Sequence, residues 1–182
     1  MEVFYLKITI NSPMQPTLFK QTVKVNDAIT GYLSANKFYQ LVFGKHSFKS
    51  KFGTSIVSLN EQGKQNGKRS WTMNLQKRGT TKEKTGSMVM TSKMKDTFRN
   101  NATFYEAVFN DDKYYVKKPY MQLGKEEAFL YNSEDVLLAN IISSYKQKPR
   151  LKKVIVLNND IKFKEEEIAF FIVTLNTTMF VS

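Results

Sequence analysis

Short β-prone runs separated by turn-forming residues constrain the fold of this chain more than any other feature. The first, residues 2–10, alternates apolar and polar side chains as a half-buried strand does. Similar runs recur to the end of the chain, bounded by Gly, Pro, Asn or Asp. We expect strands at residues 18–25, 52–59, 70–76, 103–109, 114–117, 154–157, 161–163 and 168–175. Strands this short, joined by turns, predict an antiparallel sheet.

Two segments with helical spacing interrupt these strands. Asn26 and Asp27 suit the N-cap of a helix that reaches residue 43, and Ser133 suits the cap of a helix over about 134–146. The resulting order predicts an α+β fold within a single domain, residues 1–182. The simplest candidate is a ferredoxin-like core with an antiparallel sheet, two main helices and a protruding basic β-hairpin.

The excess positive charge is concentrated in residues 44–101. This segment holds 13 Lys and Arg against three acidic residues, while residues 102–182 hold eleven of each sign. A concentrated basic block predicts a polyanionic partner, of which nucleic acid is the commonest. A solvated face, an acidic protein and a membrane surface are the alternatives. Glycines interrupt the block, so the long amphipathic helix of a membrane-bound protein does not fit it, and we expect a basic hairpin or loop insertion.

The tip of the expected hairpin is the Asn66-Gly67 turn, which is followed by the basic pair Lys68 and Arg69. Trp71 comes next and is a candidate for stacking on an RNA base. We expect the RNA phosphates to contact the basic residues of this block and of a second cluster near residue 150: Lys45, Lys49, Lys51, Lys64, Lys68, Arg69, Lys77, Arg78, Lys93, Lys95, Arg99, Lys148, Arg150, Lys152 and Lys153.

The sequence offers little catalytic chemistry. It has no cysteine and one histidine, which excludes thiol nucleophiles and multi-histidine metal sites. His46, with Lys45 and Tyr39, is a candidate for metal-independent RNA cleavage, because that reaction needs a group titrating near neutrality and a cation beside the phosphate. Two clusters of carboxylates are candidates for a metal site. Residues 111–112 are better explained by a turn, and residues 165–167 by the boundary before the expected strand at 168–175. We therefore favour a non-catalytic protein without metal or cofactor.

The sequence predicts neither a membrane span nor a signal peptide. No stretch approaches the roughly 20 apolar residues that cross a bilayer. The first residues lack a basic leader followed by a small-residue cleavage site. We therefore expect a cytoplasmic protein with no membrane partner.

Four segments together resemble a known family. Tyr5–Met14 is an alternating strand that runs into Ser-Pro-Met, and Val25–Leu33 has an Asp before small and apolar residues. In Val89–Arg99, Ser92, Lys95 and Arg99 match the motif Pro-Gly-Ser-Ser-x-Lys-Gly-x-x-Arg, although its Pro and both Gly are missing. With Tyr114–Pro119, these segments resemble the RAMP (repeat-associated mysterious protein) superfamily of CRISPR effector subunits. The Gly-rich C-terminal loop of that family is absent.

The resemblance implies a ferredoxin-like palm with a β-hairpin thumb that grips the 5′ handle of a CRISPR RNA. Its implied partners are that RNA and other CRISPR effector proteins. Two alternatives stay open. The first is a phage or plasmid anti-CRISPR inhibitor of a CRISPR ribonucleoprotein, since the chain is rich in Lys, Asn and Phe. The second is a metal-independent ribonuclease that acts on guide RNA through His46.

Overall fold

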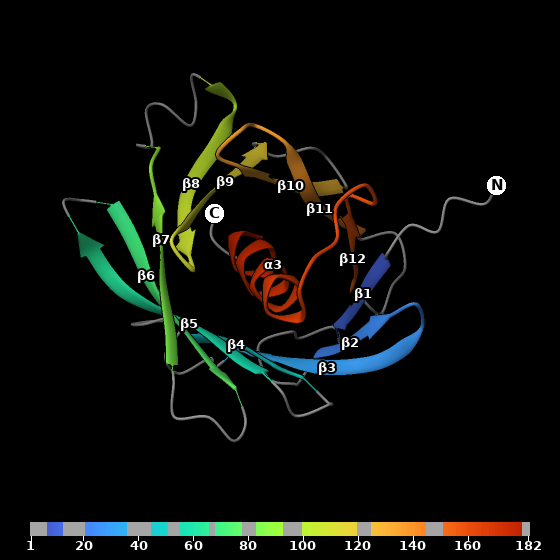
Figure 1. Ribbon diagram of the computed structural model, residues 1–182. Helices are drawn as coiled ribbons and strands as arrows, with labels where there is room; N and C mark the ends of the chain where they lie inside the picture. The colour runs from blue at the N-terminus through green and yellow to red at the C-terminus, as the bar shows by residue number, and fades with distance from the viewer. Residues whose placement is uncertain are drawn as a thin grey trace.

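A closed antiparallel barrel surrounds a single helix in the computed structural model (Figure 1). The structure describes residues 7–12, 21–35, 45–50, 55–65, 68–77, 83–92, 100–119, 125–144 and 151–179. Within these residues, twelve strands form the wall of the barrel. Barrel diameter grows with strand number, and a barrel of this size has room inside for a helix.

Each strand pairs with its neighbours in the chain, and β1 pairs with β12 to close the barrel. Order around the barrel is therefore the same as order in the sequence. The strands are β1 (Lys7–Ser12), β2 (Gln21–Val25), β3 (Ala28–Ala35), β4 (Lys45–Ser50), β5 (Ser55–Gln65), β6 (Lys68–Lys77), β7 (Glu83–Met90), β8 (Ala102–Phe109), β9 (Asp112–Pro119), β10 (Lys125–Asn132), β11 (Leu137–Ser144) and β12 (Leu151–Leu157).

Two-residue turns join β2 to β3 and β8 to β9. Asn26 and Asp27 have φ of 46° and 65°, and Asn110 and Asp111 have φ of 53° and 68°. Asn and Asp tolerate this left-handed backbone, and turns with two such residues match the twist of antiparallel strands. The hairpin expected around residue 110 is confirmed.

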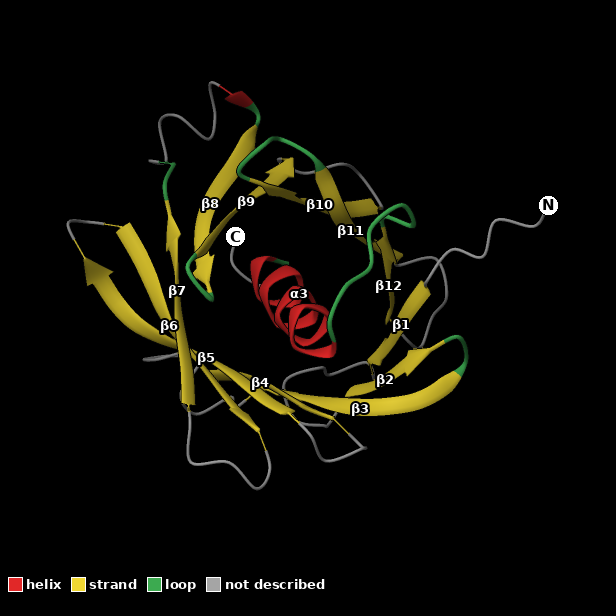
Figure 2. Ribbon diagram, in the orientation of Figure 1, coloured by secondary structure: helices red, strands yellow, loops and turns green. Residues whose placement is uncertain are grey.

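Helix α3 (Glu165–Thr178) runs through the barrel, as the red ribbon in Figure 2 shows. Every residue from Ala169 to Thr178 is buried, so the helix has no polar outer face. A helix without a solvated polar face is stable only when it is surrounded. The Phe170 ring stacks on Phe109 of β8 with centroids 4.8 Å apart. Alternate residues of the strands, such as Ile8, Ile10, Met73 and Ile155, fill the rest of the interior.

The predicted ferredoxin-like α+β core with two main helices is wrong. Residues 28–35 form strand β3, so Asn26 and Asp27 are turn residues instead of helix caps. Gly31 lies in β3 where a Cβ would collide with the Phe48 ring. Residues 137–144 of the second expected helix form strand β11, whose Ile141 and Ala139 point into the core.

The expected strand at 168–175 is also wrong, because these residues belong to α3. Their Ile, Val and Thr side chains favour strands locally, yet the barrel interior requires a segment that satisfies its own backbone hydrogen bonds. Residues 161–163 are not a strand but lead into the helix. Within the described residues, no helix has the length and apolar character needed to span a bilayer.

Candidate functional site

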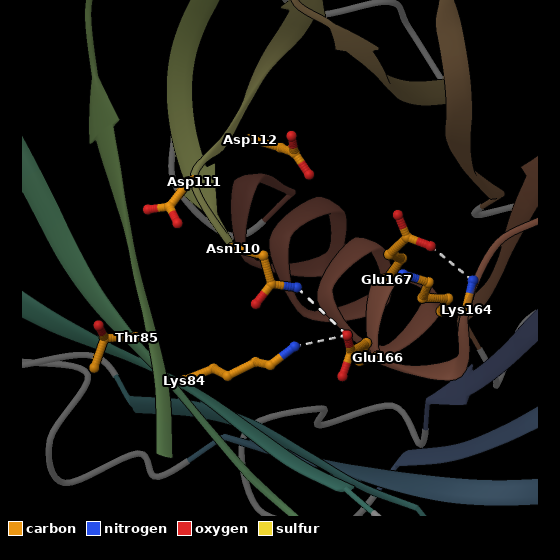
Figure 3. Close-up of a pocket in the computed structure, with 8 residues that line it drawn as sticks. All are labelled: Lys84, Thr85, Asn110, Asp111, Asp112, Lys164, Glu166 and Glu167. Atoms are coloured by element: carbon orange, nitrogen blue, oxygen red, sulfur yellow. Dashed lines mark hydrogen bonds and ion pairs between the residues drawn. The ribbon is translucent and has the colours of Figure 1, made fainter. Parts of the chain in front are cut away.

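A polar pocket lies at the end of the barrel where helix α3 begins. It has a volume of about 560 Å³ and is formed by the start of β7, the β8–β9 turn and the first turn of α3. Lys84 of β7 and Asn110 of the turn both point toward Glu166 on the helix (Figure 3). The Lys84 Nζ lies 2.9 Å from Glu166 Oε1, and Asn110 Nδ2 lies 3.5 Å from the same oxygen. These contacts fasten the helix to two parts of the wall.

The pocket holds charges of both signs. Its lining includes two lysines and four carboxylates, among them Asp112 and Glu167. Burial raises the pKa of the neighbouring Tyr114 to about 12, and the negative charges of Asp112 and Glu167 add to the effect. Among the described residues, no three carboxylate or imidazole groups lie close enough together to hold a metal ion. The Glu167 carboxylate instead accepts the Lys164 backbone N–H at 2.7 Å, which caps the helix.

The wall of the barrel is divided by charge. Strands β1–β7 come from residues 1–101, which hold 17 Lys and Arg against five acidic residues, whereas β8–β12 come from residues 102–182, which hold eleven of each. Counted over the strands alone, β1–β7 hold nine Lys and Arg against two acidic residues, and β8–β12 hold six against four. Since order around the barrel follows the sequence, the strands with the larger excess of positive charge are neighbours on one side. We call β1–β7 the basic side and β8–β12 the neutral side.

The outer face of β1–β4 shows the character of the basic side. Lys7 and Lys49 are exposed, and Lys24 is half-buried. Tyr32 of β3 is 38 % exposed and pairs directly with Lys49 of β4. The sequences of these four strands contain no acidic residue, and the nearest one in the chain is Asp27 of the β2–β3 turn. Lysines and an aromatic ring therefore share a surface free of carboxylates.

The β5–β6 hairpin extends this surface. Strand β5 pairs with β4 up to Asn60, and within the described residues its continuation to Gln65 pairs with β6 alone. Lys68 and Arg69 begin β6 at the far end of the hairpin, which projects beyond its neighbours in Figure 1. The expected pairing of the strands on either side of residues 66–67 is present, but β5 and β6 belong to the barrel wall and not to a hairpin on a ferredoxin-like core. Of the rest of the basic block, the described strands β4 and β7 lie in the wall of the barrel.

Two expected RNA contacts are corrected by the structure. Trp71 is 1 % exposed and points into the barrel, where its ring lies 6.1 Å from Tyr105, so it leaves no face open to a base. Lys153 is 2 % exposed and its Nζ donates a hydrogen bond to Asn176 Oδ1 of α3 at 2.9 Å. Arg69 lies partly over Trp71, with its Cζ 5.8 Å from the ring centroid.

The structure describes only some of the other residues that were predicted to contact RNA. Lys49 is exposed and Lys68 is partly exposed, so both side chains are accessible to a phosphate. The described residues give the backbone position alone for Lys45, His46, Lys64, Lys77 and Lys152. The predicted residues Tyr39, Lys51, Arg78, Lys93, Lys95, Arg99, Lys148 and Arg150 lie outside the described residues.

One feature of the surface went unnoticed in the sequence. Four aromatic residues lie on the outer face of β8, β9 and β10: Phe104 and Phe129 flank Lys117, and Tyr115 pairs with Tyr131. Their alternation with the buried Tyr105, Tyr114 and Leu130 carried the signal. It was missed because the segment around 125–132 was not recognised as a strand.

Comparison of this chain with protein-family models, with curated proteins and with solved structures finds no match.

Proposed function

We propose that this chain is a non-catalytic RNA-binding protein whose basic side holds the phosphate backbone. The observation that supports the proposal is the division of the barrel wall by charge, because the topology places the strands richest in Lys and Arg side by side. Phosphate contacts from lysine and arginine supply most of the affinity in sequence-independent binding. The projecting β5–β6 hairpin adds reach to that surface.

The strength of salt dependence follows from the number of phosphates. A surface that neutralises about six phosphates loses about a thousandfold in affinity between low and moderate salt. Lys7, Lys24 and Lys49 on the described strands, with Lys68 on the hairpin, supply four of these contacts. A flat response of affinity to salt would contradict the proposal.

A matched pair of charge reversals tests where RNA binds. K24E/K49E alters the basic side, and K113E/K117E makes the same change of charge on the neutral side, where both lysines are exposed. Fluorescence anisotropy with a labelled single-stranded RNA should show a loss of roughly tenfold or more for the first pair and a clearly smaller loss for the second. Equal losses would show that net charge alone drives binding and would overturn the assignment of the site.

The particular RNA is a separate question. A place in a CRISPR effector complex, with the 5′ handle as ligand and other effector proteins as partners, stays a prediction, as do the inhibitor and the His46 ribonuclease. The ferredoxin-like palm implied by the resemblance is not the fold, so the proposal depends on charge and topology instead. A cytoplasmic location also stays a prediction. Sequencing the RNA that copurifies at low salt tests the ligand: a short RNA with a constant 5′ end favours the handle.

A further inference from the structure

The basic side presents one exposed aromatic ring among its described strands. Strands β1–β7 contain three aromatic residues, which are Tyr32, Phe48 and Trp71. Phe48 and Trp71 are buried, whereas Tyr32 is 38 % exposed. Gly31 and Leu33, which precede and follow Tyr32 in β3, are buried, and successive side chains of a strand point to opposite faces. The ring of Tyr32 therefore points outward from the barrel.

The strand register places lysines on both sides of this ring. Tyr32 pairs with Lys49 of β4 on one side and with Thr22 of β2 on the other. Directly opposed side chains have Cβ atoms about 5 Å apart. Lys24 lies two residues beyond Thr22 in β2 and pairs with the partly exposed Thr9 of β1, so it lies on the same outer face. Strands β2 and β4 are about 10 Å apart across the sheet, with Tyr32 between them.

A second tyrosine of equal exposure has different neighbours. Tyr115 on the neutral side is also 38 % exposed, but it pairs with Glu106 of β8 and with Tyr131 of β10. A carboxylate beside a ring repels the phosphates of a nucleic acid. Strands β1–β4, which surround Tyr32, contain no acidic residue. Of these two tyrosines, Tyr32 alone has surroundings that complement a polyanion.

We propose that Tyr32 stacks on an unpaired base, and that the basic side therefore prefers single-stranded RNA to duplex RNA. Bases of a single strand are free to stack on an exposed ring while nearby cations hold the flanking phosphates. Lys24 and Lys49 are placed for those phosphates. In a duplex the bases are paired and stacked on one another, so the ring adds nothing to binding. This inference rests on the proposed RNA binding by the basic side, and it names the form of RNA and the residue that selects it.

Fluorescence anisotropy with a labelled single-stranded RNA and with a duplex of the same length tests the stacking. Y32A should lose roughly fivefold or more in affinity for the single strand. It should keep its affinity for the duplex, which also shows that the variant is folded. Y32F retains the ring and should bind both RNAs like the wild type. Y115A removes a ring of equal exposure beside Glu106, so it is the matched control and should bind like the wild type.

The salt dependence of binding separates the ring from the charges. Y32A should keep the wild-type slope of log affinity against log salt, because it loses no phosphate contact. K49M should lower the magnitude of that slope by about 0.7, the value for one phosphate of a single strand. If K24E/K49E loses affinity while Y32A binds both RNAs like the wild type, the stacking inference is overturned and the proposed RNA binding stands. If K24E/K49E binds RNA like the wild type, the proposed RNA site itself is wrong.

Photocrosslinking shows the contact directly. A single-stranded RNA that carries 5-iodouridine crosslinks to aromatic rings in contact with the modified base, and the crosslinked peptide should contain Tyr32. Y32T removes the ring but keeps a residue that favours strands, so it should lose the crosslink and the same affinity as Y32A. Crosslinks that map only to other residues, such as Tyr115, would overturn the inference. Equal losses of single-strand and duplex affinity in Y32A and Y32T would also overturn it, because the ring would then act without stacking on a base.

Discussion

Inside the barrel, the ammonium group of Lys153 donates a hydrogen bond to the side-chain oxygen of Asn176, with 2.9 Å between Nζ and Oδ1. Both residues are 2 % exposed. The contact joins β12 of the wall to the last turns of α3, where the helix dipole favours a positive charge. Lys153 therefore belongs to the packing between helix and wall, and its charge is not offered to a ligand.

Replacing Lys153 should affect stability and leave RNA binding unchanged. K153M keeps the length of the side chain but leaves the Asn176 oxygen without this donor, so the free energy of unfolding should fall by about 1–3 kcal/mol. N176L should cause a similar loss, and the double variant should lose less than the sum of the two. Urea denaturation measures the stability. K7M, at an exposed lysine on the adjacent strand β1, is the control and should change stability by less than about 0.5 kcal/mol.

The burial of Trp71 can be tested by fluorescence, because it is the only tryptophan in the sequence. A ring that is 1 % exposed should emit at short wavelength and resist collisional quenchers in the folded protein. Saturating RNA should leave this emission nearly unchanged, because bases cannot reach the ring. Strong quenching by RNA in the folded protein would restore Trp71 as a stacking residue.

The sequence predicted the hairpins better than the helices, for a physical reason. Turns such as Asn110-Asp111 are encoded locally, by residues that tolerate positive φ, and the alternation beside them is equally local. The helical conformation of residues 168–175 is not determined by the local sequence. Ile172, Val173 and Thr174 favour a strand by themselves, and they are helical because a closed barrel surrounds them. Nothing within that segment shows that twelve strands elsewhere will close into a barrel.

For the candidate site, the concentration of positive charge was predictable from the sequence, whereas the direction of single side chains was not. The segment counts identified the basic block, and the chain-order topology keeps its described strands, β4–β7, next to one another. Whether a lysine side chain points into or out of the barrel depends on its place in the alternation along its strand. The predicted strand began at Val154, although β12 begins at Leu151, so the inward direction of Lys153 could not be anticipated. Trp71 failed for a different reason: the predicted strand 70–76 already contained it, and its alternation with Met73 and Leu75 places it on the inward face.

Phe170 should be among the most sensitive positions in the helix. It is fully buried, stacks on Phe109, and lies 4.9 Å from the Tyr114 ring between centroids. F170A should lower the free energy of unfolding by about 3–5 kcal/mol, a large part of the total stability of a domain. I168A on the same helix, where the side chain is only partly buried, should lose clearly less. Equal losses in urea denaturation would show that the helix does not fill the barrel as described.

The Lys84–Glu166 ion pair should hold the start of α3 against the wall. Glu166 is 7 % exposed, so loss of a partner leaves its charge poorly compensated. K84M should lower the free energy of unfolding by roughly 1–3 kcal/mol. It should also speed amide hydrogen exchange in the first turns of the helix. K113M, at an exposed lysine of β9, is the control. Faster exchange throughout the barrel, without a preference for α3, would contradict the anchoring role.

Alkaline pH should destabilise the protein through tyrosines that stay protonated when folded. Burial, followed by the charges of Asp112 and Glu167, raises the pKa of Tyr114 from 10.0 to about 12, and burial also raises the pKa of Tyr105. Below pH 10 both folded and unfolded states hold these protons, so the stabilisation is fully present. Between pH 10 and about 12 the unfolded chain loses protons that the folded protein keeps, and the free energy of unfolding falls.

Removing the Tyr114 hydroxyl should flatten this alkaline loss. Y114F has no proton to lose, so its free energy of unfolding should fall less steeply than that of the wild type between pH 10 and 12. Part of the loss should persist, because Tyr105 is still present. Y115F, at the exposed neighbour, should follow the wild-type curve. Urea denaturation across this range provides the measurement, and an identical slope in Y114F and the wild type would show that Tyr114 ionises as easily in the folded protein as in the unfolded chain.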